Sequence, residues 1–174
     1  MQATTSRALL SFLQYQRASV LSVVEGLSEA DWHRPVVPSG WTGAGMLWHL
    51  GGVEHHWLQD VVTGVAEDVQ EELPEDGELI TPYDPEAAFL SDSSGADLIA
   101  SYREECRRSD EILAVTPLSA APRGLRFHGD QEYTAQIASV RWIVLHVIEE
   151  TAVHSGHLEI ARELLDGRTR LGGR

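Results

Sequence analysis

Hydrophobic residues recur at spacings of three and four in four separate segments of the chain. This spacing places one apolar stripe along a helix, so each segment is predicted to be an amphipathic α-helix. No segment shows the alternation of apolar and polar residues that is typical of a strand. The predicted helices cover about residues 6–26, 42–62, 96–115 and 134–165. Four long amphipathic helices predict an all-α four-helix bundle.

Residue types that start and stop helices mark the same boundaries. Thr42 and either Ser93 or Ser94 precede helix starts, while Gly26, Gly64 and Gly167 follow helix ends. Residues 65–93 carry many acidic side chains and three prolines, and show no helical period. We therefore expect a long, solvated crossover loop between the second and third helices of the bundle.

Composition narrows the class of protein. The 174 residues, 43% hydrophobic and 23% charged, are typical of one globular domain spanning 1–174. No apolar run is long enough to cross a bilayer and no signal peptide is evident, so we expect a cytoplasmic protein without membrane contact. A net charge of −14 disfavours nucleic acids as partners. Cys106 is the sole cysteine, which excludes an internal disulfide and a cysteine-based zinc site.

The fourth predicted helix carries a ladder of chemically active side chains. His146, Glu150 and His154 follow one another at intervals of four, and His157 lies one turn beyond His154. Each helical residue turns by ~100°, so these side chains share one face, beside apolar residues that point into the bundle. A carboxylate near a core is costly unless it is paired or binds a metal. Glu150 and His154 have the spacing with which two side chains hold one ion.

The second predicted helix offers a counterpart. His49 and His56 lie on or beside its apolar stripe, whereas His55 is expected to point elsewhere into solvent. One of these histidines together with Glu150 and His154 would form a His₂Glu set that leaves metal positions open for catalysis. A plain ion pair between Glu150 and His154, with His146 beside it, is the structural alternative.

Three segments carry a resemblance to a known family: LSEADW at 27–32 followed by PSGWT at 38–42, LWHLGGVEHHW at 47–57, and HVIEETAVHSGHLEIARELLDG at 146–167. The chain resembles the DinB superfamily, and within it the actinobacterial branch related to the N-terminal domain of mycothiol-dependent maleylpyruvate isomerase. The resemblance spans nearly the whole chain and implies a four-helix bundle of DinB type. It also implies a divalent metal bound by His49, Glu150 and His154.

The resemblance implies a metal-dependent thiol transferase or isomerase that uses mycothiol and a small electrophilic substrate. Zinc is the first choice of metal, and nickel or iron would suit the same ligands. A metal-dependent hydrolase and a non-catalytic metal- or ligand-binding protein are the alternatives. Bundles of this kind also associate through outer helix faces, which allows a homodimer.

Further side chains are candidates for roles around this metal. His157 and His146 are candidate catalytic residues, as proton carriers or as neighbours that orient a ligand. Three arginines are candidates for binding the cofactor, although pairing with acidic side chains on the helix surface would also explain them: Arg126, Arg141 and Arg162. Trp41 and Trp57 are expected to form a wall of the pocket, and Cys106 is expected to lie in the core.

Overall fold

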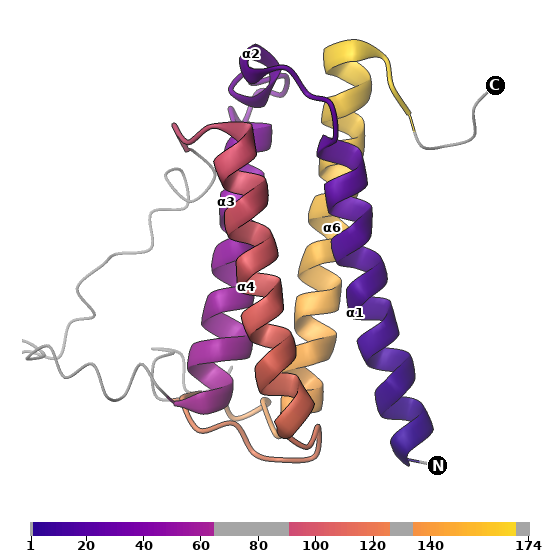
Figure 1. The fold of residues 1–174 in the computed structure, drawn as a ribbon, viewed down its shortest axis with the longest axis vertical. Coiled ribbons are helices and arrows are strands. Elements are labelled where there is room, and N and C mark those ends of the chain that lie inside the picture. Colours follow the sequence, from indigo (N-terminus) through magenta and orange to yellow (C-terminus); the bar gives the residue numbers. More distant parts are fainter. Residues whose placement is uncertain (1, 65–90, 126–133, 170–174) are drawn as a thin grey trace, which may run out of the picture.

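The computed structural model describes residues 2–64, 91–125 and 134–169, and these residues form an all-helical bundle without strands (Figure 1). The predicted fold class is therefore confirmed. In chain order the bundle contains α1 (Gln2–Val24), the short α2 (Glu29–Trp32), α3 (Gly43–Val53) continuing into the π-helix η1 (Glu54–Val61), α4 (Gly95–Val115) and α6 (Val140–Asp166).

The direction of the helices explains why a crossover is needed. In Figure 1, α3 with η1 runs in the same direction as α4, while α1 and α6 run the opposite way. The end of η1 and the start of α4 therefore lie at opposite ends of the bundle. The crossover loop predicted over 65–93 falls mostly outside the described residues, which resume at Ser91.

The helix boundaries follow the expected capping chemistry. The Thr42 hydroxyl accepts a hydrogen bond from Gly45 N (3.1 Å), and the Ser94 hydroxyl accepts one from Asp97 N (3.2 Å). Gly64 and Gly167 end their helices with φ of 75° and 74°, a left-handed conformation that favours glycine. These signals placed the starts of α3 and α4 and the ends of η1 and α6 within one or two residues.

The start of the last helix was predicted wrongly. Periodicity suggested a helix from about Thr134, but α6 begins at Val140. The backbone amides of Val140 and Arg141 donate to the carbonyls of Ala120 and Leu118 (2.9 and 2.8 Å), which anchors the helix start to the preceding loop. Ile137 is 2% exposed, so it extends the hydrophobic pattern into backbone that is not helical.

The π-helical stretch and a buried ion pair went unpredicted. Glu54 opens η1 and is 1% exposed, and both its oxygens accept hydrogen bonds from Arg17 of α1 (2.7 and 2.5 Å). Arg17 also donates to Asp110 of α4 (2.6 Å), so one guanidinium ties three helices together. The two acidic partners raise the pKa of Arg17 even though burial opposes its charge.

Apolar stripes fill the space around this ion pair. The predicted stripe of the second helix is buried throughout, with no member more than 7% exposed: Met46, Leu50, Val53, Trp57 and Val61. It meets α6 on one side and α4 on the other, and α1 packs closely against α6. The face of α3 beside this stripe is thereby held against α6, which is where the candidate ligands of the two helices meet.

Candidate metal centre

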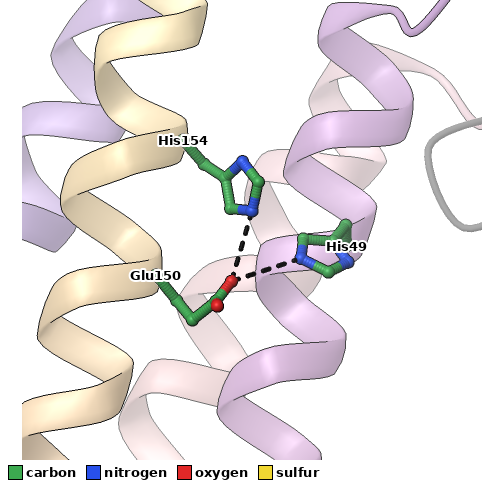
Figure 2. A group of neighbouring side chains, drawn as sticks. All are labelled: His49, Glu150 and His154. Atoms are coloured by element: carbon green, nitrogen blue, oxygen red, sulfur yellow. Dashed lines mark ion pairs between the residues drawn. The ribbon is translucent and has the colours of Figure 1, made fainter.

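The structure brings His49 of α3 together with Glu150 and His154 of α6 (Figure 2). Glu150 Oε2 lies 3.2 Å from His154 Nε2 and 3.8 Å from His49 Nε2. The two imidazole rings stand edge to face with their centroids 4.9 Å apart. One potential ligand atom from each residue lies within 4.8 Å of the other two. Of the two histidines that the sequence left open on the second helix, His49 is the one beside Glu150.

The donor set fits a divalent metal. Ligands ~2.1 Å from a tetrahedral zinc lie about 3.4 Å from one another, so small side-chain rotations would gather these three atoms around one ion. Two imidazoles and a carboxylate suit zinc, nickel or iron. The three side chains are 13–31% exposed, which leaves a solvent-facing side for further ligands.

The charge of Glu150 is held in place by its neighbours. Hydrogen bonding to His154 and His49 lowers the pKa of Glu150 far below its usual range, although partial burial opposes this effect. The side chain is therefore a carboxylate at neutral pH, which is the form a metal requires. The close contact of Glu150 with His154, on which the alternative of a plain ion pair depends, is present, and His49 joins it from the other helix.

His146 lies one helical turn before Glu150, within a cluster of aromatic rings. Its ring meets that of Trp57 edge to face at 4.6 Å and stacks on that of Trp142 at 5.3 Å. Partial burial lowers the pKa of His146 from 6.5, with the charges of Glu150 and Glu149 acting in the opposite direction. The ring is therefore neutral at pH 7 and able to accept a proton.

His157 lies at the opposite end of the metal set. Its ring centroid is 5.5 Å from that of His154 and 6.1 Å from that of Trp41, and its side chain is exposed. Trp41 and Trp57 thus flank the site from its two ends. His55 points away, as expected, and is 50% exposed; it faces Glu105 (3.2 Å) and Asp60 (3.5 Å).

Of the three candidate cofactor-binding arginines, the two that the structure describes lie away from this site. Arg126 lies outside the described residues. Arg141 lies in the first turn of α6, nine residues or about 13 Å along the helix before Glu150. Arg162 is 4% exposed and donates to the carbonyls of Val23 and Glu25 (2.7 and 2.8 Å), so its side chain caps the end of α1.

The fold and this side-chain cluster define a class of protein: an all-helical bundle with two imidazoles and a carboxylate facing one another between two helices. The model of the mycothiol S-transferase family matches residues 8–167, and the chain belongs to that family, which is of the DinB type. No curated protein and no solved structure gives a significant match. No helix in the described part of the chain is long and apolar enough to cross a membrane.

Proposed function

We propose that this protein is a metal-dependent transferase that joins the sulfur of mycothiol to a small electrophilic molecule. The main support is the convergence of His49, Glu150 and His154, whose potential ligand atoms lie within 4.8 Å of one another. In addition, the chain matches the model of the mycothiol S-transferase family over almost its full length. These three side chains would hold the metal, with zinc as the first choice. When bound, such a metal lowers the pKa of a coordinated thiol, so that thiolate forms near neutral pH.

Two histidines of the chain would accept and transfer the proton that the thiol releases. His146 is neutral at pH 7 and lies one turn from Glu150, so it can accept the proton that the thiol loses. His157 is exposed and close to His154, so it can pass protons to solvent. The sulfur electron pair then forms the bond to the electrophilic carbon, and a leaving group departs with its bonding pair.

The nucleophile is supplied from outside the chain. Burial, followed by the charge of Glu54, raises the pKa of the Cys106 thiol to about 12. A thiol with that pKa is almost entirely protonated at neutral pH and is a poor nucleophile. Cys106 lies on α4 and packs against the core, as the sequence predicted.

Turnover of a chromogenic electrophile such as 1-chloro-2,4-dinitrobenzene, with zinc-loaded protein and mycothiol, tests this proposal. We expect conjugation that stops when the metal is chelated and falls at least ~100-fold in His49→Ala and His154→Ala. His33→Ala is the matched control, because His33 contacts the Ser91 carbonyl (3.1 Å) away from the site. Conversion of the electrophile at the same rate without thiol would overturn the proposal and favour the hydrolase. No turnover by metal-loaded protein would favour a binding protein.

A further inference from the structure

A cavity lies between α3 and α4, beside the face of α3 that carries His49. Its volume is about 240 Å³, large enough for a small organic group. Leu47, Leu98 and the ring of Tyr102 supply an apolar floor, and Ser101 and Glu105 stand on its α4 side. Such a combination of apolar surface with a few polar groups is typical of a small-molecule site.

Two consecutive glycines form the α3 wall of this cavity. Apart from the neighbouring backbone of its own helix, a Cβ atom at Gly51 or at Gly52 would meet no atom of the described residues within 4 Å, so packing among these residues requires neither glycine. Glycine in the middle of a helix is nevertheless less favourable than alanine. The pair leaves bare backbone beside the cavity, which lets a ligand approach the helix closely.

Trp48 stands over the same cavity with 53% of its surface exposed. It directly precedes the candidate ligand His49. At ~100° per residue, Gly52 lies about 40° from Trp48 and about 60° from His49 around the helix, and so between them. At Gly52 itself, therefore, α3 carries no side chain between Trp48 and His49.

The polar group on the far wall is already oriented. Glu105 Oε2 accepts a hydrogen bond from Gln59 (2.7 Å) and lies 3.2 Å from His55 Nδ1. Among the described residues, Glu105 Oε1 accepts no hydrogen bond, so it can accept one from a ligand hydroxyl. An exposed indole face opposite a fixed carboxylate is how proteins hold pyranose rings, whose C–H faces are apolar and whose edges carry hydroxyls.

We propose that this cavity binds the sugar part of the thiol co-substrate, which crosses α3 over Gly52 and places its sulfur at the His49–Glu150–His154 set. This inference rests on the proposed function. In mycothiol, an acetylated cysteine is joined through an amide to a glucosaminyl inositol, so the molecule carries no charge besides that of its thiolate. A neutral, hydroxyl-rich co-substrate suits a chain with a net charge of −14, which would repel an anionic thiol such as glutathione.

The direct test is binding of the thiol-free and uncharged sugar, N-acetylglucosaminyl inositol, to metal-free and zinc-loaded protein, measured by NMR titration. We expect binding in both forms, weakened about tenfold in Trp48→Ala and Gly52→Gln. Phe12→Ala, an exposed aromatic of α1, and Gly156→Gln, an open helical glycine of α6, are matched controls that should bind as the wild type does. Absence of sugar binding to the wild type, or unchanged binding in Trp48→Ala, would overturn the inference.

Kinetics with two thiols separate this inference from the proposed function. In Trp48→Ala we expect KM for mycothiol to rise about tenfold, with KM for N-acetylcysteine amide, which lacks the sugar and is also uncharged, unchanged. If the protein turns over mycothiol but Trp48→Ala changes KM for neither thiol, the proposed transferase function stands and the proposed sugar site is rejected. If the sugar binds in a Trp48-dependent way but the protein turns over no thiol, the proposed sugar site stands and the proposed transferase function is rejected.

Discussion

Glu150 and His154, one helical turn apart on α6, hold their Oε2 and Nε2 atoms 3.2 Å from each other, and His49 approaches the same carboxylate oxygen from α3. The carboxylate is thus the centre of the cluster rather than a peripheral member. One of its oxygens faces both imidazoles, and the three side chains converge from regular α-helical backbone in α3 and α6. This arrangement makes Glu150 the most informative position to change.

Glu150→Gln should weaken metal binding at least ~10-fold while the bundle stays folded, because the amide keeps the shape of the side chain and removes its charge. Glu150→His should retain the metal, because imidazole is itself a ligand of zinc. Bound metal measured by elemental analysis and the Tm of each variant test this. Metal bound to Glu150→Gln as tightly as to the wild type would show that Glu150 is not a ligand and would direct attention to Glu149 or His157.

Stability of the metal-free protein should fall as pH drops below about 6.5, in part through His146. Its pKa in the folded state lies below the unfolded value, so in this range the unfolded chain takes up the proton first. The loss continues until the pH passes the folded pKa, and above pH 6.5 His146 contributes nothing. The free energy of unfolding at pH 7.5 and 5.5 should therefore differ less in His146→Gln than in the wild type. Equal differences in the two proteins would contradict this assignment.

The buried pair of Arg17 and Glu54 should be costly to break on one side only. Glu54→Gln leaves a guanidinium that is 3% exposed without its main counter-charge, and we expect a loss of about 3–5 kcal/mol in urea unfolding. The double variant Arg17→Met with Glu54→Leu should lose less than the sum of the single changes, because it leaves no buried charge unpaired; Asp110, which also loses Arg17, is half exposed. Arg107→Ala, which removes two exposed ion pairs on α4, with Glu104 and Glu111, should change stability little. Additive losses would show that the pair is not coupled.

Cys106 should resist thiol reagents in the folded protein. With a pKa raised to about 12, its thiolate fraction at pH 8 is roughly one in ten thousand, and the side chain is largely covered. Labelling with 5,5′-dithiobis(2-nitrobenzoic acid) should be at least ~100-fold slower in buffer than in guanidinium chloride. Rapid labelling of the native protein, with its circular dichroism spectrum unchanged, would contradict the burial of this thiol.

Local spacing made the α6 half of the site predictable. His146, Glu150 and His154 are spaced four residues apart, so the sequence alone predicts that their side chains share one face of the helix, whichever helix packs against it. The choice of His49 over His56 needed either the family resemblance or the packing of α3 on α6, because both histidines lie near the same stripe. The ion pair between Arg17 and Glu54 joins positions 37 residues apart, and no local pattern reports such pairing.

The cavity beside Trp48 had no sequence signal of its own. From the sequence, a pair of glycines in a helical pattern indicates only a weak point of the helix. A tryptophan in the same pattern is interpreted as a packing residue, because the sequence does not show whether its ring is exposed. Only the arrangement of α3 against α4 shows that Gly51 and Gly52 line a cavity among the described residues. The start of α6 was misplaced for the opposite reason, since Ile137 satisfies the helical period while its backbone is held by the loop before the helix.

The distance along the chain between His49 and Glu150 has a consequence for the metal itself. An ion bound by both residues would act as a reversible cross-link that closes a loop of about 100 residues. In the unfolded chain, closing a loop of this length costs conformational entropy, so the ion would bind mainly to the folded protein. Its contribution would grow with the concentration of free metal, as for any ligand that binds the folded chain alone. Metal supply would then set the lifetime of the protein as well as its activity, and a chain made during metal shortage would be the first to be degraded.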